Sequence, residues 1–324
     1  MTPLVSVIIP CFNPEKFIAQ TLNSVLQQTY KSLEILIIDD HSTDNSYAIA
    51  QNFAKEHPQI VKVLKNESKG ACAARNMGFQ HSKGAYIQYL DADDLLSPQK
   101  IEKQVTSLID YPDSIAVCAT WNFTDNINNA TNTDAPYLFS TDQACDFFIN
   151  LWGGNKKEPN MVQTSAWLTP RTLIEKNGSW NISLSKDQDG EFFARIALNS
   201  NGIKFVPDIK NFYRKHIYGG NIASLKKKQH LESNLLATQL KEQYLFTQTQ
   251  SDKAKYAIAT QYKHVAIEAW PNFKDISNVA LKKCNELGGS NYSPILGGKV
   301  IETIKKLCGW KSAKSFSYYI HKLL

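Results

Sequence analysis

Several features are missing from this chain of 324 residues, and each absence excludes a class of protein. No apolar run approaches the ~18–20 residues that a membrane-spanning helix needs. The six cysteines are scattered and form no C-x-x-C pair, which argues against both a zinc site and a disulfide framework. Around the apolar residues 4–9 there is neither a preceding basic segment nor a following cleavage site, so we expect no secretory signal and a cytoplasmic protein.

Two glycine-rich nucleotide motifs are also missing. A dinucleotide-binding dehydrogenase needs a glycine-rich turn after its first strand, but residues 10–13 read Pro-Cys-Phe-Asn. No G-x-x-x-x-G-K followed by Ser or Thr is present, which excludes P-loop chemistry.

Arginine is missing from the C-terminal third, where the positive charge is concentrated. The whole chain carries +6, but residues 226–324 hold 16 Lys, no Arg and seven acidic residues, a balance of +9. Residues 1–225 hold 20 basic and 23 acidic residues, a balance of −3. Lysine without the arginine that bidentate phosphate recognition favours does not suit nucleic acid, so we expect no nucleic acid partner.

What is present in the first 120 residues is an alternation of apolar runs with helical stretches. Five runs predict strands, at residues 5–9, 35–38, 61–64, 86–90 and 115–119. Strands joined by helices of ~10–15 residues are typical of a mostly parallel, doubly wound α/β sheet.

The pattern becomes purely helical towards the C-terminus. Helices are predicted at residues 231–246, 254–270 and 278–287, with no further strand. We therefore place a domain boundary near Ser224, which divides the chain into residues 1–224 and a basic helical region, residues 225–324. Residues 122–136 are rich in Asn, Thr and Asp, and predict a surface loop or a lid-like insertion.

Three acidic clusters stand where a predicted strand ends or a helix begins. They are Asp39-Asp40, Asp91-Ala92-Asp93-Asp94 and Asp187-Gln188-Asp189-Gly190-Glu191. Ligands of open α/β sheets bind at the carboxyl ends of strands, and paired carboxylates suit Mg²⁺ or Mn²⁺ held together with substrate phosphates. Taken singly, each cluster is also explained by a solvated turn or by helix capping.

Five segments taken together are more specific. They are VSVIIPCFN (5–13), IIDDHSTD (37–44), ARNMG (74–78), GAYIQYLDADD (84–94) and QDGEFFAR (188–195). In this order and spacing they resemble the inverting nucleotide-sugar glycosyltransferases of family two, from about residue 4 to residue 220. The resemblance implies a GT-A fold, a UDP-sugar or similar donor, and a saccharide or lipid-linked acceptor in the synthesis of surface polysaccharide or glycoconjugate.

The resemblance also implies a role for each matching residue. Pro10 and Phe12 would line the nucleotide pocket, with Asp39 and Asp40 near the base. Arg75 would face the nucleotide or diphosphate. The remaining roles are Mn²⁺ or Mg²⁺ binding by Asp91 and Asp93, proton abstraction by Asp189, and a diphosphate or metal contact by His216. The family often has Glu-Asp or Asp-Asp where this chain has Gln188-Asp189, and the preceding Asp187 makes the register of that motif ambiguous.

Two other functions compete with this interpretation. A metal-dependent phosphatase could use Asp91 as nucleophile and Asp93 as acid, and a degenerate carbohydrate-binding module could bind without turnover.

The C-terminal segment, residues 299–323, mixes lysines with an apolar helical face. It is predicted to bind an anionic membrane surface on the cytoplasmic face, or else to pack on the catalytic domain or form a homodimer contact.

Overall fold

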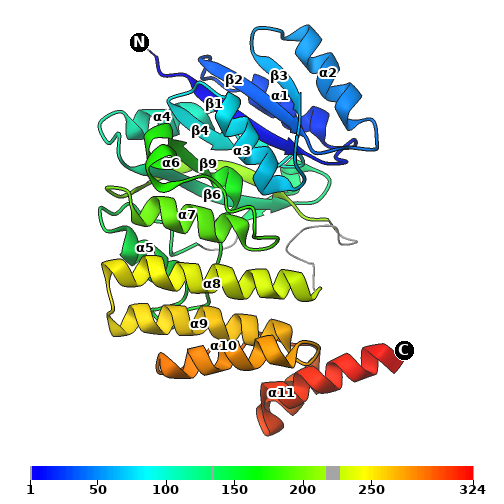
Figure 1. The fold of residues 1–324 in the computed structure, drawn as a ribbon, viewed down its shortest axis with the longest axis vertical. Coiled ribbons are helices and arrows are strands. Elements are labelled where there is room, and N and C mark those ends of the chain that lie inside the picture. The colour runs from blue at the N-terminus through cyan, green and yellow to red at the C-terminus, as the bar shows by residue number, and fades with distance from the viewer. Residues whose placement is uncertain (1, 133–134, 217–226, 324) are drawn as a thin grey trace. The chain divides into compact units, whose positions relative to one another are not determined.

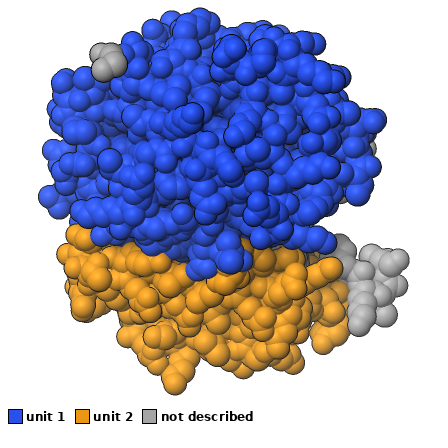
Figure 2. All heavy atoms as spheres, turned by 45° about the horizontal axis from the view of Figure 1, so that its top comes forward, with its two compact units in different colours: residues 1–147, 162–182, 188–220 blue, residues 148–161, 183–187, 221–324 orange. Residues whose placement is uncertain are grey.

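The computed structural model describes residues 2–132, 135–216 and 227–323, and it divides into two compact units (Figures 1 and 2). Unit 1 comprises Met1–Phe147, Val162–Ile182 and Gln188–Gly220. Unit 2 comprises Phe148–Met161, Ser183–Asp187 and Asn221–Leu324. Unit 2 thus contains two short segments that lie well before residue 225 in the sequence. Ser224 lies outside the described residues, and the domain boundary there stays a prediction.

Unit 1 is built on a mixed sheet. The strand order is β3-β2-β1-β4-β8-β6-β9-β5, and β7 pairs with β6. The strands are β1 (Val5–Cys11), β2 (Leu33–Asp39), β3 (Val61–Lys65), β4 (Tyr86–Tyr89), β5 (Leu95–Leu96), β6 (Ile115–Phe123), β7 (Thr131–Asn132), β8 (Trp167–Pro170) and β9 (Ile203–Arg214). β3, β2, β1 and β4 are parallel, whereas β8 is antiparallel to both of its neighbours. The predicted α/β architecture is therefore confirmed.

Helices flank this sheet (Figure 1). They are α1 (Ile18–Leu26), α2 (Ser46–Glu56), α3 (Ala71–His81), α4 (Lys100–Leu108), α6 (Arg171–Asn177) and α7 (Gln188–Leu198), while α5 (Ala144–Leu151) runs from unit 1 into unit 2. α3 packs on β1 and β2, and α4 packs on β6 and β9. Val7 and Ile8 on β1 point to opposite faces and are both fully buried, as expected for a central strand covered on both sides.

Unit 2 contains the helices α8 (Lys228–Gln248), α9 (Asp252–Ala269), α10 (Lys274–Glu286) and α11 (Lys299–Leu323). The first three confirm the helices predicted from the apolar pattern. α11 is interrupted at Gly309, whose φ of 81° is not helical. None of the helices in the described ranges combines the length and the apolar content needed to cross a bilayer.

The 122–136 segment is more regular than a loop. β6 continues to Phe123, and its residue Trp121 pairs with Asn132 of β7 in antiparallel register. The polar composition of the segment gave no sign of this pairing, because β7 is only two residues long and both of them, Thr131 and Asn132, are exposed. Residues 133–134 lie outside the described residues.

Candidate active site

The carboxyl ends of three neighbouring parallel strands meet at one edge of the sheet. Cys11 of β1 pairs with Asp39 of β2, and Ile8 of β1 pairs with Tyr89 of β4. The residues that follow these strands, including Asp91, therefore emerge at the same edge. This is the edge at which open α/β sheets bind ligands.

Asp39 carries an unsatisfied oxygen at this edge. The residue is 3% exposed, its Oδ2 accepts a 3.3 Å hydrogen bond from the amide of Ser42, and its buried Oδ1 has no hydrogen-bond partner. A buried carboxylate oxygen is costly unless a donor reaches it. Burial and the charge of Asp39 also raise the pKa of the neighbouring Cys11 to about 12, so this thiol stays protonated and inert.

Asp40 differs from Asp39 because neither of its carboxylate oxygens lacks a hydrogen-bond partner. Both carboxylate oxygens of Asp40 accept hydrogen bonds, one from Nδ2 of Asn66 at 2.7 Å and one from the amide of Gly70 at 2.9 Å. Asp40 thereby fixes the loop between β3 and α3.

Phe12 is 62% exposed, and Pro10 at the end of β1 is half-buried, so both offer apolar surface at this edge.

Arg75 on α3 joins two of the acidic clusters. Its Nη2 donates to Oδ1 of Asp91 at 2.7 Å, and its Nη1 donates to Oε1 of Gln188 at 3.4 Å. Arg75 is 5% exposed, and its Cζ lies 4.4 Å from the centroid of the Trp180 ring. Although burial opposes the charged form, the adjacent Asp91 carboxylate raises the pKa of Arg75, which stays cationic.

Two other residues of the ARNMG segment, Asn76 and Gly78, help to position the structure around Arg75. The side chain of Asn76 holds the backbone of Trp180: its Nδ2 donates to the carbonyl of Trp180 at 2.9 Å, and its Oδ1 accepts from the amide of Trp180 at 2.8 Å. Trp180 in turn stacks on Phe192 of α7, with ring centroids 4.1 Å apart. Gly78 lets α3 approach β1, since a Cβ there would lie 2.4 Å from Cγ2 of Ile8. Trp180 was not predicted from the sequence, because it stands in no recognisable motif.

Asp93 is paired with His216. Nε2 of His216 lies 2.7 Å from Oδ2 of Asp93, and the two side chains are 25% and 29% exposed. Burial and the nearby Asp91 raise the pKa of Asp93, whereas the hydrogen bond to His216 lowers it. Crowded carboxylates of this kind are stabilised by a cation.

Asp94 and Arg214 form hydrogen bonds that hold the Asp91–Asp94 loop in place, and the sequence did not predict them. Asp94 is 1% exposed and accepts hydrogen bonds from the amide of Arg214 at 2.9 Å and from Oγ of Ser165 at 3.3 Å. The Arg214 guanidinium donates to the carbonyls of Asp93 and Thr124, each at 2.9 Å. The only sequence signal was the position of Arg214 two residues before His216.

Asp189 lies in the first turn of α7 and is half-buried. The helix is anchored by Phe192 and Phe193, which are 0% and 3% exposed. Gln188 and Asp189 therefore begin a rigid helix, with Gln188 tied to Arg75.

The residues present suit a divalent cation that is shared with a substrate. Among the described residues, no group of three or more His, Cys, Asp or Glu side chains could hold a metal alone. Asp91 and Asp93 offer two hard oxygen donors, and His216 lies against the second. Mg²⁺ and Mn²⁺ are commonly held by one or two carboxylates together with substrate phosphates. The roles predicted for the individual site residues stay predictions.

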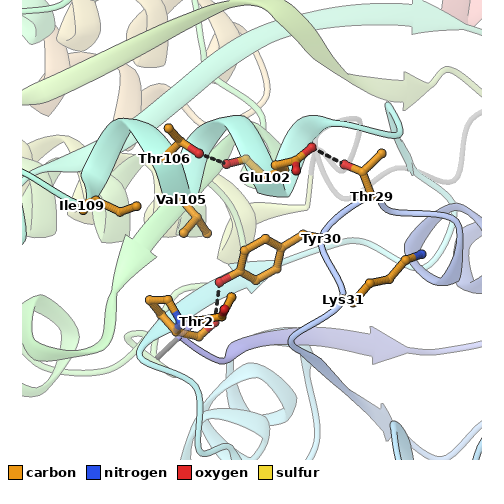
Figure 3. A pocket seen from close by; sticks show the side chains of 9 residues that line it. Thr2, Thr29, Tyr30, Lys31, Glu102, Val105, Thr106 and Ile109 are labelled. Carbon is orange, nitrogen blue, oxygen red and sulfur yellow. Dashed lines mark hydrogen bonds between the residues drawn. The ribbon is translucent and has the colours of Figure 1, made fainter.

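A hollow elsewhere in unit 1 does not belong to this site. It measures about 610 Å³ and lies at the amino ends of β1 and β2, where Thr2 and Lys31 line it (Figure 3). Its polar groups bond to one another: Tyr30 donates to the carbonyl of Pro3 at 2.5 Å, and Thr29 donates to Glu102 at 2.6 Å.

Known proteins are similar to this chain in sequence or in fold. Glycosyltransferase GlyG of Streptococcus pneumoniae is 29% identical over 227 residues, which are 66% of this chain and 72% of that protein. Two further bacterial relatives are matched over 33% of this chain and only 43% of their own length.

Two solved structures have a similar fold at low sequence identity. Staphylococcus aureus TarS 1–349, in complex with UDP-GlcNAc, gives a TM-score of 0.61 at 17% identity over 91% of this chain and 95% of that chain. Mannosyltransferase PcManGT from Pyrobaculum calidifontis, in complex with GDP-Man and Mn²⁺, gives 0.55 at 16% identity over 98% and 85%. The expected GT-A fold is confirmed.

The family itself follows from the sequence of the first half. Residues 6–171, just over half of the 324, match the family described as glycosyl transferase family 2. The matched region contains the strand ends, Arg75 and the Asp91–Asp94 loop described above. This chain belongs to glycosyltransferase family 2.

Proposed function

We propose that this glycosyltransferase transfers a sugar from a nucleotide diphosphate donor, a UDP-sugar, to a hydroxyl of a saccharide or lipid-linked acceptor. The product would be surface polysaccharide or glycoconjugate, and a single displacement would invert the anomeric carbon. The observation that carries the proposal is Arg75, which ties the Asp91–Asp94 loop to the start of α7. The complex of TarS with UDP-GlcNAc supports the choice of a UDP-sugar.

On the donor side, the unsatisfied Oδ1 of Asp39 would accept a hydrogen bond from the nucleoside, beside the exposed ring of Phe12. Asp91 and Asp93 would hold Mn²⁺ or Mg²⁺, and the Mn²⁺ bound to PcManGT supports this choice. The cation, when bound, neutralises negative charge that builds up on the departing diphosphate.

On the acceptor side, Asp189 would act as general base. Its carboxylate takes the proton of the acceptor hydroxyl, and the acceptor oxygen forms a bond to the anomeric carbon. The bond from that carbon to the diphosphate oxygen breaks, and the nucleoside diphosphate leaves with the bonding electrons. General base catalysis typically contributes ~10²–10⁴-fold.

A donor panel tests the proposal. The full chain would be incubated with UDP-GlcNAc or GDP-Man, in Mn²⁺, in Mg²⁺ or in EDTA, and the released nucleotide measured. We expect UDP release that stops in EDTA. Release of inorganic phosphate from a phosphomonoester without any nucleotide would instead support the phosphatase alternative, and binding of every donor without turnover would support the carbohydrate-binding module.

We also propose that the C-terminal helix binds an anionic membrane surface. Val300 and Leu307 lie seven residues apart on one face of α11 and are 65% and 78% exposed. Lys299 and Lys306 stand beside them and are exposed too. Exposed apolar side chains flanked by lysines suit a surface of negative headgroups over acyl chains.

Vesicle flotation tests this partner. We expect the full chain to bind vesicles containing phosphatidylglycerol and to leave pure phosphatidylcholine unbound. The double variant Val300→Ser, Leu307→Ser should bind about tenfold more weakly, because two apolar side chains no longer insert. Val279→Ser, at a 47% exposed position of α10, is the matched control. Vesicle binding of the double variant equal to that of the wild type would contradict the membrane proposal. It would also be contradicted if the full chain were a dimer and the double variant a monomer, because these side chains would then form a dimer contact.

A further inference from the structure

The segment that directly precedes Gln188 and Asp189 is fastened to the helices of unit 2. Oγ of Ser233 on α8 accepts hydrogen bonds from the amides of Ser185 and Lys186, at 2.9 and 3.0 Å. The same hydroxyl donates to the carbonyl of Lys186 at 2.8 Å. One buried serine thus satisfies three backbone groups of the segment Ser183–Asp187, which leaves this stretch little freedom.

Two ion pairs reinforce these hydrogen bonds. Nζ of Lys241 on α8 lies 2.5 Å from Oδ2 of Asp187, with side chains 3% and 29% exposed. Lys186 pairs with Glu268 on α9, with side chains 9% and 16% exposed. Because desolvated charges are costly without a partner, each pair holds its members in a narrow range of positions.

The other polar groups around these pairs keep the cluster balanced. Nδ2 of Asn234 donates to the second oxygen of Glu268 at 2.8 Å. His264 also faces the cluster, and its pKa is lowered by burial, with Lys241 and Lys186 acting in the same direction against Glu268 and Asp187. A neutral His264 leaves two lysines facing two carboxylates.

Asp187 belongs to this cluster and is the residue that directly precedes α7 in the chain. Its φ of 56° lies in the left-handed region, where a residue other than glycine is strained unless its surroundings hold it there. The ion pair with Lys241, a residue of the same unit, engages its carboxylate. The next residue along the chain, Gln188, begins α7 and is bonded to Arg75.

We propose that Lys241, through its ion pair with Asp187, is a positioning residue that sets the orientation of Gln188 and Asp189. The inference rests on the proposed role of Asp189 as the base. It gives the lysine-rich helical region a part in the reaction in addition to any contact with a membrane. Lys241 itself touches neither substrate nor reacting atoms in this account.

The test is a comparison of turnover with nucleotide binding in Lys241→Met. This change removes the charge and keeps most of the side-chain volume. We expect kcat to fall by about tenfold or more, while the donor KM and the Kd of UDP change by less than about twofold, since only a step after donor binding needs the oriented base. Lys228→Met is the matched control. Lys228 lies on the same helix, but its side chain is 53% exposed and pairs with Asp275 instead of Asp187.

A second variant guards against loss of folding in the first. Asp187→Asn removes the other member of the pair at a partly exposed position, and we expect the same fall in kcat with unchanged UDP binding. Wild-type kcat in both variants, or a loss of UDP binding parallel to the loss of kcat, would overturn the inference.

Asp189→Asn, assayed in the same series, separates this inference from the proposed function. If Asp189→Asn is inactive and binds UDP while Lys241→Met is fully active, only the positioning role fails. If Asp189→Asn is fully active, the base assignment fails and the positioning role falls with it.

Discussion

Arg75 donates from Nη2 to Oδ1 of Asp91 over 2.7 Å, and this ion pair couples α3 to the loop that follows β4. The same guanidinium reaches Gln188 at the start of α7. The buried guanidinium of Arg75 therefore fixes the position of Asp91, a proposed metal ligand, relative to the start of α7, which carries the proposed base.

Replacing Arg75 should affect both folding and turnover. Arg75→Met leaves the Asp91 carboxylate without its partner and should lower the free energy of unfolding by about 2–3 kcal/mol, because one member of a largely buried pair is lost. Turnover should fall as well. Urea unfolding and kcat measure the two effects. Lys282→Met, which removes an 81% exposed lysine 4.0 Å from Glu286, should change stability by no more than about 0.5 kcal/mol. A similarly small change in Arg75→Met would contradict the bracing role.

His216 should govern the metal response. It lies 2.7 Å from Asp93, so His216→Gln should raise the Mn²⁺ concentration for half-maximal turnover by about 10–100-fold, as loss of a neighbour or ligand of a metal site usually does. A Mn²⁺ titration of turnover measures this shift. His57→Gln, at a position that follows α2, should titrate like the wild type. An unchanged Mn²⁺ response in His216→Gln would argue that the histidine only packs against Asp93.

Lys100 should make stability depend on pH in the alkaline range. The side chain is fully buried and bonded to Gln88, and burial lowers its pKa from 10.5 to about 8. Between these values the unfolded chain binds more protons than the folded one, so this lysine makes folding more favourable as the pH rises. Its contribution should grow by about 1 kcal/mol from pH 7 to pH 9.

The measurement for Lys100 is the difference in free energy of unfolding between the wild type and Lys100→Met at each pH. Taking the difference cancels the titration of all other groups. A difference that does not change between pH 7 and pH 9 would contradict a lowered pKa at Lys100.

The sequence predicted the local parts of this molecule well. The largely apolar runs that predicted β1 to β4 are short, and a local pattern is enough to recognise them. The acidic clusters at their ends follow from the same reasoning. The roles of individual residues came from the resemblance to a family.

What the sequence did not predict depends on contacts between distant residues. Arg214 donates to Oε1 of Gln20, which lies 194 positions earlier, and no local pattern indicates such a pair. Ser233 and Lys241 look like ordinary helix residues until the segment Ser183–Asp187 is seen against them. The ambiguity over Asp187 arose for the same reason, since its ion-pair partner Lys241 lies 54 positions further along the chain.

The proposed mechanism depends on the abstraction of the acceptor's proton by Asp189. Asp189→Asn keeps the size and the hydrogen-bonding capacity of the side chain but removes the basic carboxylate. With donor and acceptor saturating, kcat should fall by about 10²–10⁴-fold while the Kd of UDP stays within about twofold of the wild type. Asp110→Asn, at an exposed position, should retain full kcat. A kcat for Asp189→Asn close to that of the wild type would contradict the account.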